Sequence, residues 1–176
     1  LTAALLRIPT MVHEQNAYLG RANHALAARA QLIALSWPQT KNLPYGVATH
    51  ITGMPVRNAF FAKRRSGCAD KKLVLSVLGG SQGATILGTL VPDALEMIDT
   101  PLLNNIRIYQ QARPEQINDL KVRYRALGIT ASIKPFFSHV PDLLIKSDLV
   151  ISRSGASSIA ELAATGCASL MLPLPS

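Results

Sequence analysis

Residues 73–83 read Leu-Val-Leu-Ser-Val-Leu-Gly-Gly-Ser-Gln-Gly, an apolar run of strand length that ends in a turn of small residues. Residues 148–156 follow the same order, because Asp-Leu-Val-Ile-Ser runs into Arg-Ser-Gly-Ala and a helical pattern comes next. Strands that alternate with helices form parallel sheets. Each turn leaves unpaired backbone N–H groups at a helix N-terminus, where the helix dipole favours a phosphate. The two stretches therefore predict an α/β domain with a nucleotide diphosphate site built mostly from backbone.

The composition indicates a globular protein with a basic surface. Of the 176 residues, 48% are hydrophobic and 16% charged, and the net charge is +8. This charge favours a partner that carries phosphate: a nucleotide, a nucleic acid or an anionic membrane surface. Aromatic residues make up only 5%, which argues against a binder of single-stranded nucleic acid. Cys68 and Cys167 lack a CxxC partner, so we expect two reduced packing thiols.

The first part of the chain predicts a β-α-β unit with parallel strands. Its apolar strands and its helix are expected at 9–13, 32–35 and 47–52, and at 17–30. Gly53, Pro55 and a basic run then indicate a linker, which gives the expected division 1–56, 57–72 and 73–176. The chain begins without Met, and both ends fall inside strand–helix units. We therefore expect two incomplete domains from a longer protein.

The second part of the chain predicts five strands with intervening helices. The strands are expected at 73–78, 106–110, 132–134, 149–152 and 168–172. Helices are expected from near Ala84, from Pro114, and over 140–146 and 156–165. We expect Pro92 to interrupt the first of these helices, because proline has no amide N–H.

The two small-residue turns supply the first candidate site residues. Gly79, Gly80 and Gly83 form neither a Walker A loop nor the dinucleotide fingerprint, and tight packing alone explains many such turns. Ser81 is the candidate hydroxyl donor to a phosphate oxygen. Beyond the second turn, Glu161 is placed to accept hydrogen bonds from ribose hydroxyls. The alternative is that Glu161 complements the helix dipole or is a solvated surface residue.

A second group of candidates lies where the first part of the chain ends its strands. His13-Glu14-Gln15-Asn16 follows an apolar strand, and His13 with Glu14 can serve as a general base and its orienting partner. The alternative is that Asn16 caps the next helix and His13 is a satisfied structural histidine. Arg57 can reach a phosphate, or it can be an ordinary surface arginine. No histidine or cysteine has metal-ligand spacing, so we expect no metal and no cofactor.

Four motifs in order resemble the MurG family of glycosyltransferase family 28. They are His-Glu-Gln-Asn at 13–16, Gly-Met-Pro-Val-Arg at 53–57, Gly-Gly-Ser-Gln-Gly-Ala at 79–84, and Arg-Ser-Gly-Ala at 153–156 followed by Glu161. Family members transfer N-acetylglucosamine from UDP-N-acetylglucosamine, with inversion, to the muramyl 4-hydroxyl of undecaprenyl-diphosphate-linked muramyl pentapeptide, which converts lipid I to lipid II in peptidoglycan synthesis. Met54 departs from the family, which usually has Asn in that place.

The resemblance implies a GT-B fold of two Rossmann-like parallel-sheet domains, with the donor bound mainly by the C-terminal one. It places Ser81 on the diphosphate, the backbone near Phe137 on the uracil and Glu161 on the ribose. The donor-binding residues implied in full are Asn16, Arg57, Ser81, Phe137, Ala156, Ser157, Ser158, Ile159, Ala160 and Glu161. The phosphate-binding turns implied are Gly79, Gly80 and Gly83, with Ser154 and Gly155.

The implied partners are UDP-N-acetylglucosamine, the lipid-linked muramyl pentapeptide and an anionic membrane surface, without nucleic acid. The implied location is the cytoplasmic face of the bacterial inner membrane, with roles in cell-wall biogenesis, cell shape and cell division. The family's N-terminal glycine-rich loop and its glutamine pair lie outside this sequence, so we expect the 176 residues alone to be inactive. Three alternatives stay open: another GT-B UDP-sugar enzyme, a non-catalytic truncated product, and a basic nucleic-acid-binding module.

Overall fold

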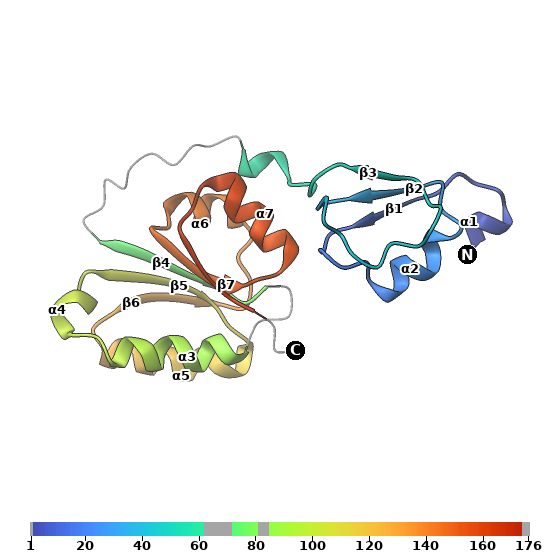
Figure 1. Cartoon of the computed structure of the whole chain (residues 1–176). Coiled ribbons are helices and arrows are strands. Elements are labelled where there is room, and N and C mark those ends of the chain that lie inside the picture. Colours follow the sequence, from blue (N-terminus) through green and yellow to red (C-terminus); the bar gives the residue numbers. More distant parts are fainter. Residues whose placement is uncertain (1, 62–71, 81–84, 174–176) are drawn as a thin grey trace. The chain divides into compact units, whose positions relative to one another are not determined.

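A computed structural model describes residues 2–61, 72–80 and 85–173, and these form two compact units, Leu1–Val56 and Arg57–Ser176 (Figure 1). Cys68, Ser81 and Gly83 fall outside the described residues. Within the described parts, no helix is long and apolar enough to cross a membrane.

The first unit is a small parallel sheet, as the sequence predicts. Its strands are β1 (Met11–Glu14), β2 (Leu32–Leu35) and β3 (Thr49–Ile51), paired in that order and all parallel. Its helices are α1 (Thr2–Leu5) and α2 (Arg21–Ala27). The core consists of four buried apolar side chains, Leu19, Ala27, Ile33 and Leu35.

Helix α2 begins at Arg21, four residues later than the predicted helix, and its N-cap is Gly20 rather than Asn16. The prediction that Asn16 caps this helix is therefore wrong. The physical reason is that residues 15–20 fold around the Glu14 carboxylate, which accepts hydrogen bonds from the backbone N–H groups of both Asn16 and Gly20.

The second unit contains a five-stranded parallel sheet in the order β6-β5-β4-β7-β8. The bounds of its strands are β4 (Leu73–Leu78), β5 (Ile106–Gln111), β6 (Thr130–Lys134), β7 (Leu149–Arg153) and β8 (Ser169–Leu172). From β4 the chain builds outward to β5 and β6 on one side, and then crosses to β7 and β8 on the other. The strand order therefore reverses between β4 and β7, which makes the sheet doubly wound.

Helices cover both faces of this sheet (Figure 1). Helices α3 (Thr85–Glu96) and α5 (Ile117–Ala126) lie on one face, and α6 (Val140–Lys146) and α7 (Ala156–Thr165) lie on the other. The remaining elements are the short helix α4 (Thr100–Leu103) and two 3₁₀ turns, η1 (Asn58–Phe60) and η2 (Pro114–Gln116). The helix predicted from Pro114 thus starts as a 3₁₀ turn.

Helix α3 runs through Pro92 without a break, so the prediction of an interruption there is wrong. Pro92 is fully buried together with its helix neighbours Leu87 and Val91, which pack into the main core of the unit. Loss of one N–H donor costs less here than exposing this apolar face would, because each large buried aliphatic side chain contributes about 1.5–3 kcal/mol.

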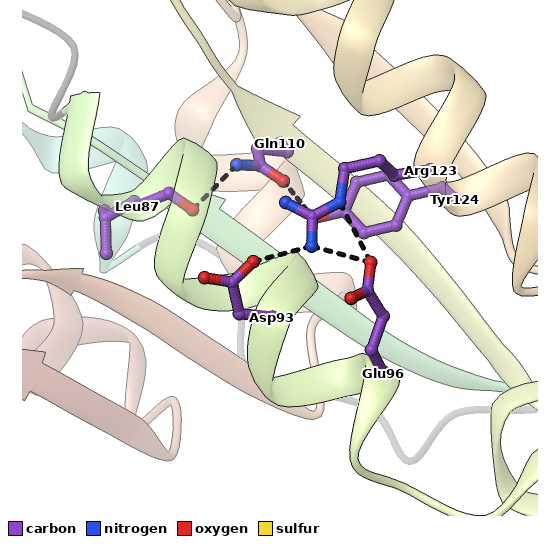
Figure 2. A network of polar contacts seen from close by, with 6 residues as sticks. All are labelled: Leu87, Asp93, Glu96, Gln110, Arg123 and Tyr124. Carbon is purple, nitrogen blue, oxygen red and sulfur yellow. Dashed lines mark hydrogen bonds and ion pairs between the residues drawn. The ribbon is translucent and has the colours of Figure 1, made fainter.

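Polar contacts join α3, β5 and α5 beneath this core (Figure 2). The buried Tyr124 hydroxyl donates to Gln110 Oε1, and Gln110 Nε2 donates to the Leu87 carbonyl at 3.2 Å. On the outer side, Arg123 Nη2 lies 2.6 Å from both Asp93 and Glu96 of α3. These contacts fix α3 and α5 against the sheet.

Candidate functional site

The two small-residue turns lie side by side at the carboxyl edge of the five-stranded sheet. Strands β4 and β7 are paired in parallel, with Leu78 opposite Ser152. Gly79-Gly80 and Ser154-Gly155 therefore leave neighbouring strands at the point where the strand order reverses, and open α/β sheets bind ligands there. Gly80 has φ +74°, a left-handed conformation that a side chain disfavours. The sequence predicted both turns, but it did not predict that they leave neighbouring strands.

The N-terminus of α7 is the part of this edge that the structure describes most fully. Gly155 is its N-cap, with φ −71° and ψ 146°, and makes no side-chain capping bond. The first-turn residues Ala156, Ser157 and Ser158 thus present backbone N–H groups that no N-cap side chain satisfies. Ile159 already donates its N–H to the Gly155 carbonyl, so it and Ala160 belong to the helix interior. This helix end is suited to an anion.

Ser154 is turned away from that helix end and toward β8. Its backbone N–H and its Oγ both donate to the Leu172 carbonyl, at 3.0 and 3.3 Å. The structure thus gives the Ser154 side chain a role in holding the turn against β8, while the backbone of the turn stays at the carboxyl edge.

Glu161 lies one turn and a half into α7 and forms an ion pair with Arg57. Arg57 Nη2 is 3.5 Å from Glu161 Oε1. The Arg57 guanidinium also lies over the ring of Phe60, 5.1 Å from its centroid. Turn η1, which contains Phe60, packs against α7. Two predicted site residues separated by 104 positions are therefore brought together within the second unit.

Phe137 follows β6 and is held in a small aromatic group. Its ring lies edge-on to Tyr109 of β5, with 6.4 Å between centroids, and Lys134 Nζ is 5.9 Å from the Phe137 centroid. The loop that carries Phe137 follows a strand two places from β4, on the same sheet edge. The ring contacts fix the path of the backbone at this position.

In the first unit, Glu14 is 2% exposed and its carboxylate accepts four hydrogen bonds. Oε1 accepts from the backbone N–H and the Nδ2 of Asn16, and Oε2 accepts from Gly20 N and Asn23 Nδ2, all at 2.9–3.0 Å. Burial by itself raises the pKa of the Glu14 carboxyl, but the bonds from Gly20, Asn16 and Asn23 together lower the pKa below its ordinary value. A carboxylate held in this way organises the loop and is a weak proton acceptor.

His13 contacts the Gly-Met-Pro-Val-Arg motif. Its Nε2 lies 3.2 Å from the Gly53 carbonyl and 3.4 Å from Ser36 Oγ. A carbonyl oxygen only accepts hydrogen bonds, so Nε2 carries the proton and Nδ1 is the basic nitrogen of the neutral ring. Ser36 Oγ also donates to Met54 Sδ at 3.7 Å, which gives the residue that departs from the family a polar contact.

Three residues of these contacts were missed by sequence reasoning: Asn23, Ser36 and Phe60. Asn23 lies in the stretch 17–30 predicted as a helix, Ser36 follows an apolar strand, and Phe60 lies in the expected linker. None carries a local signal of its partner. In the described part of the chain, no group of three or more His, Cys, Asp or Glu side chains is placed to hold a metal.

Comparison with known sequences gives matches along nearly the whole chain. Residues 74–176 match the family model of the glycosyltransferase family 28 C-terminal domain. The chain is 43% identical to the UDP-N-acetylglucosamine--N-acetylmuramyl-(pentapeptide) pyrophosphoryl-undecaprenol N-acetylglucosamine transferase of Paramagnetospirillum magneticum, over 98% of this chain and 48% of that protein. It is 42% identical to the protein of the same name from Granulibacter bethesdensis, over 96% of this chain and 45% of that protein. The chain thus spans about half the length of these curated relatives.

Solved structures agree with the sequence matches. The crystal structure of Acinetobacter baumannii MurG superposes with a TM-score of 0.74 at 30% identity, and covers 98% of this chain and 48% of that chain. The predicted α/β architecture of GT-B type is therefore confirmed. The crystal structure of Anabaena HepE in complex with UDP and glucose has a TM-score of 0.60 at 14% identity, which supports the fold alone.

Proposed function

The chain belongs to glycosyltransferase family 28, and on this premise we propose that the protein transfers N-acetylglucosamine from UDP-N-acetylglucosamine to the muramyl 4-hydroxyl of undecaprenyl-diphosphate-linked muramyl pentapeptide. The names of its curated relatives support this reaction. The observation that carries the proposal is the pairing of β4 with β7, which brings two small-residue turns to one sheet edge. This arrangement at the carboxyl edge of its sheet fits the second unit to the role of the donor-binding half of such an enzyme.

The second unit binds the UDP part of the donor. Gly79 and Gly80, continued by Ser81 and Gly83, and the α7 N-terminus from Gly155 neutralise the diphosphate with backbone N–H groups. The α7 segment from Ala156 to Ala160 lines the donor, Glu161 accepts from the ribose hydroxyls and the backbone near Phe137 holds the uracil. Because these donors also stabilise the charge that develops on the leaving UDP, they lower the barrier to transfer without a metal.

The transfer is a single displacement. The muramyl 4-oxygen attacks the anomeric carbon, the bond from that carbon to the UDP oxygen breaks, and the hydroxyl proton moves to a base. Of the two candidates, His13 suits the role of base through Nδ1, and Glu14 suits a positioning role because four donors occupy its carboxylate. Asn16 and Arg57 contact the donor.

The protein acts at the cytoplasmic face of the bacterial inner membrane as a peripheral protein, and its product serves cell-wall growth, cell shape and division. The net charge of +8 supports attraction to an anionic membrane surface, since each basic residue near such a surface contributes about 1 kcal/mol. We propose no nucleic-acid partner. The domain division we propose is 1–56, a linker 57–72, and 73–176.

Titration calorimetry of the 176-residue chain with UDP, UDP-N-acetylglucosamine and ADP, with and without EDTA, tests the donor site. Selective binding of the uridine nucleotides that EDTA leaves unchanged is expected. Ser157→Asp provides the sharper test, because a carboxylate in the first turn of α7 favours the helix but repels a diphosphate. Asn118→Asp, which adds the same charge to the first turn of α5, is its control.

The expected result is that Ser157→Asp abolishes UDP binding without lowering the melting temperature, whereas Asn118→Asp binds like the unmodified chain. Equal UDP affinity in both variants would place the nucleotide elsewhere, and ADP binding as tight as UDP binding would contradict a uridine-specific site.

A further inference from the structure

Phe60 was not among the predicted site residues, yet the guanidinium of Arg57 lies over its ring. Phe60 is 0% exposed, although it lies in the short turn η1 within the stretch 57–72 expected to be a linker. Turn η1, which contains Phe60, packs against α7, the helix that carries Glu161. The contact of η1 with α7, together with the complete burial of Phe60, makes the segment that begins at Arg57 part of the second unit.

The Arg57 side chain is 68% exposed, and its long stem is not confined by burial. An exposed ion pair at 3.5 Å contributes little by itself, because the entropy of ordering both side chains offsets the Coulomb attraction in water. The guanidinium also lies over the Phe60 ring, 5.1 Å from its centroid. A guanidinium that lies over a fully buried ring has fewer positions open to it, and this restriction favours the pair with Glu161.

The ion pair uses Glu161 Oε1 and one of the five N–H donors of Arg57. The carboxylate keeps acceptor capacity for ribose hydroxyls while Arg57 is in place, and the guanidinium keeps donors for a phosphate oxygen. Arg57 and Glu161 are thus compatible with simultaneous contact to the ribose and the diphosphate of one nucleotide.

We propose that Phe60 is a positioning residue of the nucleotide site: its buried ring holds the Arg57 guanidinium against Glu161, so that both side chains are preorganised for UDP. This role rests on the proposed function. Preorganisation acts by lowering the entropy lost on binding, so it affects nucleotide affinity without any contact between Phe60 and the ligand.

The test compares Phe60→Leu with Phe61→Leu, its neighbour in sequence, which is 60% exposed. UDP affinity by calorimetry should fall about three- to five-fold in Phe60→Leu, the size of an exposed cation–π contact, and stay unchanged in Phe61→Leu. In the Arg57→Gln background, Phe60→Leu should have no further effect, because the residue it positions is gone. Circular dichroism melts of all variants establish that each is folded.

A second readout needs no nucleotide. The Arg57 Nε–Hε resonance, assigned with Arg57→Gln, should show an ordered side chain in the unmodified chain and in Phe61→Leu, and a mobile one in Phe60→Leu and in Glu161→Gln. An equal loss of UDP affinity from Phe60→Leu with and without Arg57 would show that Phe60 acts only through packing and would overturn the proposal. An Arg57 resonance that does not respond to Phe60→Leu would overturn it as well, even if UDP binds. Absence of UDP binding by the unmodified chain with an ordered Arg57 would instead refute the nucleotide site, and this role of Phe60 with it.

Discussion

Replacing Glu14 by Gln should destabilise the first unit strongly, although the change is nearly isosteric. Each carboxylate oxygen of Glu14 accepts two hydrogen bonds. In Glu14→Gln an NH₂ group replaces one of these oxygens, so two of the four N–H donors face another donor and lose their acceptor. A hydrogen bond to a charged group contributes about 1.5–3 kcal/mol, and losing two of them costs about 3 kcal/mol or more. With a urea m-value of about 1 kcal/mol/M for a unit of this size, the midpoint moves by about 3 M.

The chain offers a specific probe for this measurement. Trp37 is its single tryptophan, lies in the first unit, and donates Nε1–H to the Gln15 carbonyl at 3.0 Å, beside the Glu14 loop. Urea unfolding followed by Trp37 fluorescence therefore reports on the first unit alone. Glu115→Gln makes the same charge change at an exposed position of the second unit and should leave the Trp37 transition unchanged.

The pH dependence gives an independent check of the same reasoning. The hydrogen bonds lower the pKa of Glu14 in the folded state below its ordinary value of 4.5, so the unfolded state binds the proton more readily. The stabilisation is then fully present above pH 4.5 and is lost as the pH falls through the folded pKa. The gap in unfolding free energy between the unmodified chain and Glu14→Gln should narrow in that range. A midpoint shift of less than about 0.5 M at pH 7, or a gap that is independent of pH, would refute this account of Glu14.

Three further predictions concern the second unit. Gly80→Ala should lower its stability by about 1–2 kcal/mol in thermal melts, because φ is +74° although the added Cβ meets no atom within 4 Å; an unchanged melting temperature would contradict that conformation. Tyr124→Phe should lower the free energy of unfolding by about 1–3 kcal/mol, because Gln110 Oε1 loses its donor. Burial raises the pKa of Tyr124 in the folded state, so above pH 10 the unfolded state loses the phenol proton first and the protein becomes less stable. Tyr124→Phe should remove this loss of stability, and alkaline unfolding followed by circular dichroism checks both effects. Arg123→Ala should destabilise the α3–α5 contact by about 1–2 kcal/mol in urea unfolding, with a smaller effect in 1 M salt, and an effect that salt does not alter would show that packing dominates.

The strands of the second unit could be predicted from the sequence because their signals are local. The runs at Leu73–Leu78 and Leu149–Arg153 are continuous, apolar and bounded by small residues, which is the pattern of buried parallel strands. The same holds for α7, whose predicted and observed bounds coincide and whose C-cap Gly166 takes φ +63°. Boundaries were lost where a tertiary contact outweighed the local preference, as at Pro92, which the core of the unit holds inside a helix.

The predicted start of α2 was wrong for a related reason. The Ala- and Leu-rich stretch from Ala17 has good helix propensity, which predicts an earlier start. The buried Glu14 carboxylate needs donors, and the chain supplies them from Asn16 and Gly20 in a non-helical path. Helix propensity differs by only a few tenths of a kcal/mol per residue, so the bonds to a buried charge outweigh it.

The candidate site divides into a part that could be read from the sequence and a part that could not. A phosphate site made of backbone leaves a local trace, because only small residues allow the chain to turn from a strand into a helix and expose its N–H groups. Both turns carry that trace, and strand pairing alone then decides whether they meet. The Arg57–Phe60–Glu161 cluster leaves no such trace, because a guanidinium, a ring and a carboxylate are ordinary residues wherever they occur and no period links positions 104 apart. Arg57 and Glu161 could each be named as a candidate from the sequence, but their pairing could not. The residue that we propose positions them is found only by its burial: Phe60 is completely enclosed in a segment that composition assigns to a linker.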